Sequence, residues 1–136
     1  MIRSPLRPPG CRHPLWFGAA TALLTALSCA PAGAQGAEGE RLFRQRCAAC
    51  HSVETGGRGS GPSLAGVLGR RAGTLGGARY SQAMQGAGLV WDAETLDAFL
   101  QNPRDTVPGT RMAVRIPDPE QRAAIISFLR DAGAGG

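Results

Sequence analysis

Residues 53–88 are rich in glycine and show little hydrophobic periodicity. Glycine recurs along them at short intervals, which favours turns over regular elements: Gly56-Gly57, Gly59, Gly61, Gly66, Gly69, Gly73 and Gly76-Gly77. A loop region of this length without a core of its own is unusual in a compact domain. These residues are therefore either disordered or wrapped around a group that supplies the missing core.

A cysteine pair followed by a histidine stands just before this stretch, in Cys47-Ala48-Ala49-Cys50-His51. Thiols at positions i and i+3 lie about one helical turn apart. They can add to the two vinyl groups on neighbouring edges of a haem, and the histidine then faces the iron from one side. The pattern predicts one covalent haem c, bound through Cys47 and Cys50, with His51 as an axial ligand.

Residues 1–34 have the order of a secretory signal peptide. A positive start at Arg3, Arg7 and Arg12 precedes an apolar run at residues 15–27, and small residues lead up to Ala34. The run is short for a hydrocarbon core about 30 Å thick. An uncleaved anchor is one alternative. Lipid anchoring at Cys29 is another, although the residues before it depart from the lipoprotein pattern. We expect cleavage after Ala34, a mature domain at residues 35–136 and a periplasmic location.

Cleavage there would leave twelve arginines against ten acidic residues, a net charge of +2 instead of the +5 of the whole chain. Two haem propionates would bring the protein close to neutral. Nucleic-acid binding therefore loses its main support, because the excess basic charge lies in the leader.

Other uses of the cysteine pair fit less well. A thioredoxin-like pair would start a helix that follows a strand, and no strand pattern precedes Cys47. A zinc site would need two more ligands, but the mature chain has one histidine and no further cysteine. A plain disulfide would leave the glycine-rich residues without a core.

The second axial ligand of the haem is expected to be a thioether. The single histidine of the mature chain excludes bis-histidine ligation, and Met84 and Met112 remain as donors. Met84 lies in an expected helical turn, where a buried methionine usually serves packing. Met112 lies in an exposed-looking loop and is the favoured ligand. With both axial positions filled, electron transfer is favoured over catalysis on a small-molecule substrate.

Helices are predicted on both sides of the glycine-rich residues. The first spans residues 38–47, after a loose end at residues 35–37. The second has Asp92 as its N-cap, and Pro103 stops it, because the residue before a proline is pushed out of helical geometry.

A further loop is expected at residues 104–117, before the last helix. That helix begins at Pro119 with Asp118 as its cap, and Gly133 lies just beyond its end. No strand pattern competes with these segments, so the predicted fold class is all-α.

From about residue 39 to residue 129, the sequence resembles the class I cytochromes c, particularly the mitochondrial and related bacterial type. The matches follow in order: Gly39-Glu40-Arg41-Leu42-Phe43, the C-x-x-C-H pattern, Gly61-Pro62-Ser63-Leu64, Gly69-Arg70-Arg71, Tyr80, Trp91, Asn102-Pro103 and Pro108-Gly109-Thr110-Arg111-Met112. The resemblance implies the small all-α cytochrome c fold around one haem. In it, Gly39 and Phe43 would cross the last helix near Ile125 and Phe128.

The resemblance also implies roles for residues around the haem. The Pro62 carbonyl would accept the second N–H of His51, which orients the imidazole and strengthens it as a ligand. Four side chains would lie around the propionates: Arg70, Tyr80, Trp91 and Thr110. Tyr80 and Trp91 can alternatively be ordinary core aromatics.

Two departures from the family pattern make the interior less polar. Phe99 stands where the family often has a tyrosine whose hydroxyl lies close to the methionine sulfur. Met84 stands where an asparagine is common in a buried polar network. We expect both to alter the reduction potential and the strength of the iron–sulfur bond.

The implied function is that of a monomeric one-electron carrier between redox-partner proteins, not an enzyme. Arg46, Arg104 and Arg111 would ring the exposed haem edge and steer acidic partners, or are simply solvated. The acidic residues from Asp92 to Asp97 would give the molecule a dipole. The alternatives are a dedicated cytochrome subunit of a periplasmic dehydrogenase and a haem sensor or peroxidase-like protein, in which Met112 leaves the iron.

Overall fold

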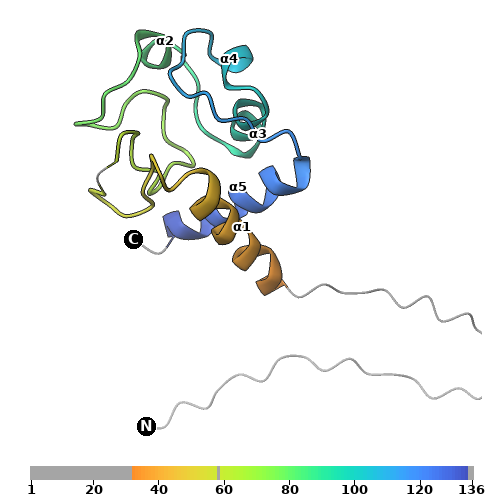
Figure 1. Cartoon of the computed structure of the whole chain (residues 1–136). Coiled ribbons are helices and arrows are strands. Elements are labelled where there is room, and N and C mark those ends of the chain that lie inside the picture. The colour runs from red at the N-terminus through yellow and green to blue at the C-terminus, as the bar shows by residue number, and fades with distance from the viewer. Residues whose placement is uncertain (1–31, 58, 135–136) are drawn as a thin grey trace, which may run out of the picture.

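The computed structural model of the chain describes residues 32–57 and 59–134. The apolar run of the leader and Cys29 lie outside these residues. Helices account for the regular structure of the described part (Figure 1): α1 (Ala32–Arg46), α2 (Gln82–Gln85), α3 (Ala93–Gln101), α4 (Pro103–Thr106) and α5 (Pro119–Ala134). The described residues contain one isolated antiparallel bridge, between Arg71 and Val90, and no named strand. The all-α fold class is confirmed.

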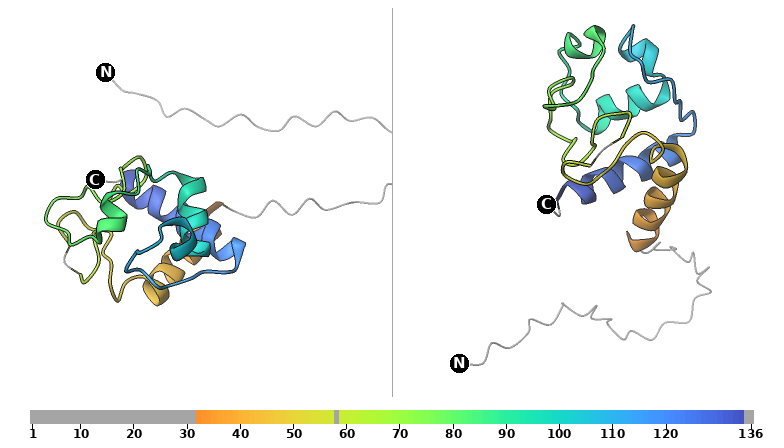
Figure 2. Two further views of the ribbon diagram at one scale, coloured as in Figure 1. Left: turned by 90° about the horizontal axis from the view of Figure 1, so that it is seen from above. Right: turned by 60° about the vertical axis from the view of Figure 1, so that its left-hand side comes forward.

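Helices α1 and α5 cross at a glycine (Figures 1 and 2). A Cβ atom on Gly39 would overlap the carbonyl oxygen of Ala124 and lie 2.8 Å from Cβ of Phe128. Beside this point, the rings of Phe43 and Phe128 pack with their centroids 5.3 Å apart. The predicted crossing is present, and the missing side chain of Gly39 is what allows the two helices to approach so closely.

Helix α3 begins with a reciprocal cap. The Asp92 carboxylate accepts a hydrogen bond from the Thr95 N–H at 2.8 Å, and Thr95 Oγ1 accepts one from the Asp92 N–H at 2.9 Å. The apolar face of this helix is buried. Pro103 does end α3, but it also begins α4, because its fixed φ suits the first position of a helix. The expected loop at residues 104–117 therefore starts with a short helix.

The predicted outer ends of the first and last helices were wrong. Helix α1 begins at Ala32, so residues 35–37 are helical, although the segment includes the poor helix former Gly36. Helix α5 runs to Ala134 and includes Gly133. A Cβ on Gly133 would lie 3.2 Å from Cα of Gly66, so glycine lets the last turn pass this loop. No helix of the described residues is long and apolar enough to cross a membrane.

The glycine-rich residues form a defined set of turns, drawn from yellow to green in Figure 1. Their backbone is tied to the segment before α3: Gly69 N–H donates to Trp91 O at 2.7 Å, and Trp91 N–H donates to Arg70 O at 2.9 Å. Gly69 adopts a φ of 83°, which favours glycine. The core lies between these loops, α3 and the α1–α5 pair, and consists mainly of aliphatic and aromatic side chains.

Candidate haem site

The two thiols lie on a tight turn that follows α1. The N–H groups of Cys50 and His51 both donate to the Cys47 carbonyl, at 3.0 and 2.9 Å. Neither thiol is in a disulfide; Cys47 is buried and Cys50 is exposed. Burial raises the pKa of the Cys47 thiol to about 11. The helix before the pair differs from the strand that a thioredoxin-like site would require.

His51 is fixed by the loop that follows it. Its Nδ1–H donates to the Pro62 carbonyl at 2.8 Å, the contact that the resemblance implies. The ring lies against Gly61, where a Cβ would come within 2.5 Å of Cε1. With the proton on Nδ1, the Nε2 lone pair is available to a metal ion.

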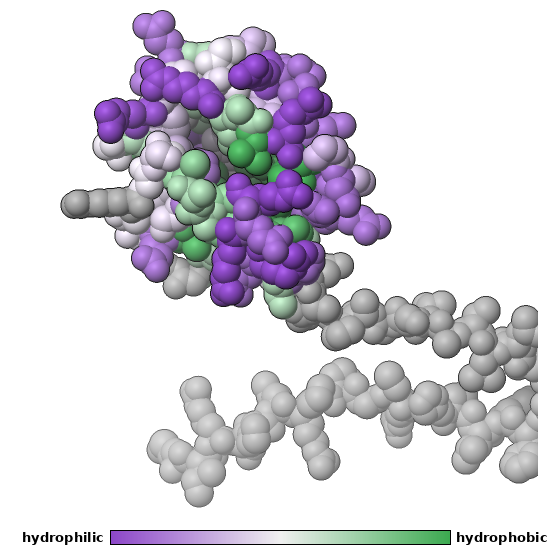
Figure 3. Space-filling model, in the orientation of Figure 1, coloured by the Kyte–Doolittle hydropathy of each residue, from purple (hydrophilic) through white to green (hydrophobic). Residues whose placement is uncertain are grey.

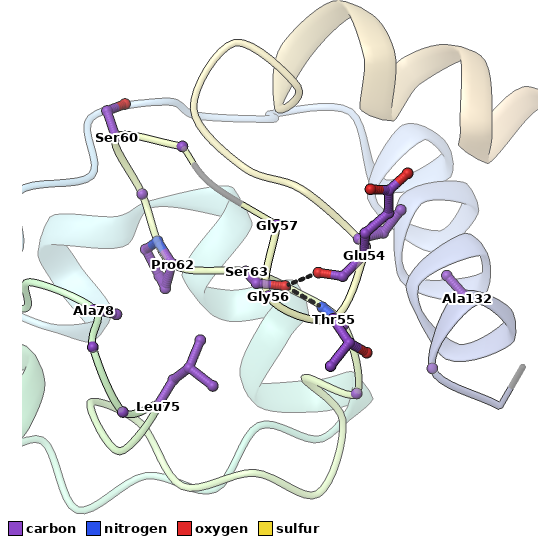
Figure 4. A pocket seen from close by; sticks show the side chains of 18 of the residues that line it. Glu54, Thr55, Gly56, Gly57, Ser60, Pro62, Ser63, Leu75, Ala78 and Ala132 are labelled. Atoms are coloured by element: carbon purple, nitrogen blue, oxygen red, sulfur yellow. Dashed lines mark hydrogen bonds between the residues drawn. The ribbon is translucent and has the colours of Figure 1, made fainter. Parts of the chain in front are cut away.

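Ser63 fastens this loop and was not predicted as part of the site. Its buried hydroxyl donates to the Glu54 carbonyl at 2.8 Å and accepts a hydrogen bond from the Ala65 N–H at 3.2 Å. Figure 4 shows the hydroxyl within the loop, next to Pro62. A serine directly after the Pro62 position gave no signal of burial in the sequence.

Met112 lies in the loop between α4 and α5, partly buried against the core. The loop rests on α2, because a Cβ on Gly109 would lie 3.0 Å from Cβ of Ala83. Thr110 is buried, and its Oγ1 accepts a hydrogen bond from the Met112 N–H at 3.3 Å. Four residues later, Ile116 is 1% exposed and its N–H donates to the Leu100 carbonyl at 2.8 Å. Met112 is thus held between two buried anchors.

Met84 is buried in the core from the short helix α2. Ser81 caps that helix by accepting a hydrogen bond from the Met84 N–H at 3.2 Å. Trp91 and Phe99 belong to the same apolar cluster, with ring centroids 5.0 Å apart. This is the environment expected for a packing methionine.

The side chains expected around the propionates have different surroundings. Trp91 is buried, and Tyr80 is partly buried against the same cluster. The guanidinium of Arg70 donates to the carbonyls of Ser63 at 2.8 Å and Ala65 at 3.0 Å, so that it also braces the loop after His51.

The surface near these residues is hollowed. Figure 3 shows apolar residues gathered in a depression on one face, within a polar surround. A recess of ≈ 1050 Å³ is lined by residues 53–57, 59–63, 65–66 and 75–79 and by the end of α5 (Figure 4). Pro62 lines this recess, but His51, Met112 and the two thiols do not. The recess is therefore not itself the expected haem site.

The residues present fit a haem. One turn offers two thiols and the His51 imidazole, whose Nδ1 is already hydrogen-bonded to Pro62. A separate loop offers a thioether, and both segments border the apolar core. The donor set of nitrogen and thioether sulfur suits a haem iron. Within the described residues, no group of three or more His, Cys, Asp or Glu side chains comes together.

Comparison with known proteins points the same way. Residues 36–133 match the family model described as Cytochrome c. A cytochrome c of Nigella damascena is 39% identical over 107 residues, covering 77% of this chain and 96% of that protein. A cytochrome c2 iso-2 of Magnetospirillum fulvum is 47% identical over 85 residues, covering 62% and 88%. A cytochrome c of Chlamydomonas reinhardtii is 42% identical over 107 residues, covering 77% and 95%.

Proposed function

The chain belongs to the cytochrome c family, and we propose on this premise that it is a soluble one-electron carrier of the periplasm, its haem iron bound between His51 and Met112. Members of this family carry one covalently attached haem c. The observation that carries the proposal is the 2.8 Å hydrogen bond from His51 Nδ1–H to the Pro62 carbonyl. It selects Nε2 as the nitrogen that can bind iron.

Cys47 and Cys50 would hold the haem by two thioethers, each formed when the S–H of a thiol adds across a vinyl double bond. Cys50 is exposed whereas Cys47 is buried. The haem edge held by Cys50 would therefore lie nearest to solvent, and we place the entry and exit of the electron there.

Bound haem supplies an iron that alternates between the ferrous and ferric states with no bond made or broken. Met112 would bind the iron through its thioether, which favours the ferrous state and would raise the potential. Thr110 and Ile116 keep its loop against the core. With His51 and Met112 both bound, no coordination position is left for a substrate, which is why we favour electron transfer over an enzymatic reaction.

The periplasmic location rests on the leader. Residues 1–34 carry the positive, apolar and small-residue order of a signal peptide, and one relative is a bacterial cytochrome c2. Export with cleavage after Ala34 predicts a mature holoprotein that starts at Gln35. Intact-mass measurement of protein from the periplasmic fraction tests this, and a retained leader or a lipid on Cys29 would give a larger mass.

The partners would be membrane-bound or periplasmic oxidoreductases that the protein contacts transiently as a monomer. Exposed arginines at Arg46, Arg104 and Arg111 are available to acidic partners. A stable complex with one dehydrogenase on purification would instead identify a dedicated cytochrome subunit.

The proposed ligation is tested by the ferric absorption spectrum. A methionine sulfur bound to ferric haem gives a weak charge-transfer band in the far red. We expect the band in the wild-type holoprotein and in Met84→Leu, and its loss in Met112→Ala. A wild type that lacks the band and binds carbon monoxide rapidly in the ferrous state would contradict the proposal and favour a haem sensor.

A further inference from the structure

One buried arginine joins three parts of the chain. Arg122 on α5 is 6% exposed. Its Nε donates to Oδ1 of Asp97 on α3 at 2.7 Å, and its Nη1 donates to the carbonyls of Ile116 at 3.0 Å and Pro117 at 2.8 Å. A buried guanidinium is tolerated when it is paired and hydrogen-bonded, and Arg122 has all of these contacts.

The two carbonyls bound by Arg122 end the loop that carries Met112. The backbone of Ile116 is hydrogen-bonded on both sides: its N–H donates to the Leu100 carbonyl of α3, and its carbonyl accepts from Arg122 of α5. Between Met112 and Ile116, the chain consists of exposed residues 113–115. Within these residues, Arg115 Nε makes one exposed, long hydrogen bond of 3.4 Å to the Gln101 carbonyl. On this side of Met112, the first buried attachment to the core is the one that Arg122 and Leu100 provide at Ile116.

We infer that Arg122 is a positioning residue for the methionine ligand: it fixes the end of the loop so that Met112 stays on the iron. The inference rests on the proposed His51/Met112 ligation. A thioether is a weak ligand. The iron–sulfur bond is more stable when the loop gains little conformational entropy on breaking it. Loosening the end of the loop increases that freedom and therefore favours the open form.

The population of the open form can be measured with added imidazole, which binds ferric haem only where Met112 has left. Its apparent affinity rises in proportion to the fraction of molecules that are open. If Arg122 had a purely structural role, its removal would lower the free energy of unfolding without a selective effect on imidazole binding.

The experiment compares variants of the ferric holoprotein. Arg122→Met keeps an unbranched apolar side chain, shorter than that of arginine, and removes the guanidinium. We expect it to bind imidazole about tenfold more tightly than the wild type, or tighter still, and to have a weaker far-red sulfur band. Arg122→Lys keeps the charge but cannot reach all three acceptors together, so its affinity should be intermediate; it also serves as the test if Arg122→Met does not fold.

Two controls separate positioning from other effects. Arg130→Met removes an exposed arginine from the same helix and controls for charge. Phe128→Leu weakens the α1–α5 contact, away from the loop, and controls for global stability. Both should leave imidazole affinity close to that of the wild type.

The outcomes distinguish this inference from the proposed function. If the wild type shows the far-red band and the Arg122 variants bind imidazole no better than Phe128→Leu, the positioning role is overturned while His/Met ligation stands. If the wild type itself lacks the band, the proposed ligation fails, and the positioning role fails with it.

Discussion

Phe99 places a plain hydrocarbon ring in the interior beside the candidate haem site. It is buried, and its ring is tilted by 57° against Trp91 at a centroid distance of 5.0 Å. The described residues include only three buried polar or charged side chains, namely Ser63, Thr110 and Arg122. An interior of this kind gives little stabilisation to the extra positive charge of a ferric haem.

A hydroxyl at this position tests whether a hydrogen bond to the methionine sulfur acts on the iron, because greater polarity alone would stabilise the ferric state and lower the potential. In Phe99→Tyr, we expect the new hydroxyl to donate to the Met112 sulfur, which withdraws electron density from the iron. The reduction potential should rise, and the far-red band should be lost at a lower pH than in the wild type. Spectroelectrochemistry and a pH titration measure the two effects. If neither changes, the hydroxyl does not reach the sulfur.

Individual residues differ in how far the sequence alone could place them. The cysteine pair and His51 are adjacent in the chain, so their pattern predicts their joint role. The bond from His51 to Pro62 was predictable only through the family resemblance. Arg122 could not be placed, because its partner Asp97 comes from another helix and its other acceptors are backbone carbonyls, which any residue supplies.

Among the elements, helix α1 offers two glycines with different expected effects, one at the crossing with α5 and one away from it. In Gly39→Ala, the new methyl group would overlap the Ala124 carbonyl and press against Phe128. The helices must then separate, which should destabilise the protein by about 1–3 kcal/mol.

Gly36→Ala, three residues earlier in α1, is the matched control, because a Cβ there meets nothing within 4 Å. It should leave the free energy of unfolding nearly unchanged, since position 36 is the second residue of the expected mature chain and helix ends contribute little to stability. Denaturant unfolding of the holoproteins measures both changes. Equal losses of stability in the two variants would contradict the close-crossing explanation.

The cap of α3 makes its stability dependent on pH. The Thr95 amide and hydroxyl donate to Asp92, and these bonds lower the pKa of the Asp92 carboxyl. The cap therefore stabilises the fold fully above the unfolded pKa of about 4, and the effect is lost as pH falls through the lower folded value.

Asp92→Ala should accordingly lower the melting temperature by a few degrees at neutral pH, and by less as the pH falls below the unfolded value. Glu94→Ala removes a neighbouring charge without removing the cap and should have a smaller effect. Thermal unfolding at several pH values separates the two. A deficit in Asp92→Ala that is constant with pH would show that the charged cap is not its cause.

The starts of α3 and α5 were more predictable than the start of α1 or the end of α5. Asp92 and Asp118 mark the starts of their helices, because their carboxylates accept hydrogen bonds from backbone N–H groups of the first turn. The end of α5 is decided instead by Gly133 passing Gly66, a contact between residues far apart in the chain. Local sequence carries no record of such contacts, so the prediction stopped the helix at the glycine.

At the scale of the whole molecule, the expected mature chain has a small net charge of +2, but its charged side chains are unevenly distributed. Arg46, Arg104 and Arg111 are exposed, whereas Asp97 is paired with Arg122. Asp97 therefore contributes less to a molecular dipole than its place on α3 predicted. Asp92 and Glu94 remain exposed on that helix.

If these arginines steer partners, electron exchange with an acidic redox protein should slow markedly as ionic strength rises. Arg104→Gln and Arg111→Gln should each lower the second-order rate constant several-fold at low salt and flatten its salt dependence. Arg130→Gln, at the end of α5, should change neither by much. Stopped-flow kinetics decides the matter, and rates indifferent to salt in the wild type would exclude steering.

The turns between His51 and Trp91 have one consequence for the cell. They include one four-residue helix, α2, and otherwise irregular backbone. We therefore expect these turns to pack into a stable structure only when a cofactor occupies the space that they surround. A chain that never receives haem would remain open to the proteases of its compartment. Clearance of defective copies would then need no dedicated sensor, and the abundance of working carrier would follow the supply of haem.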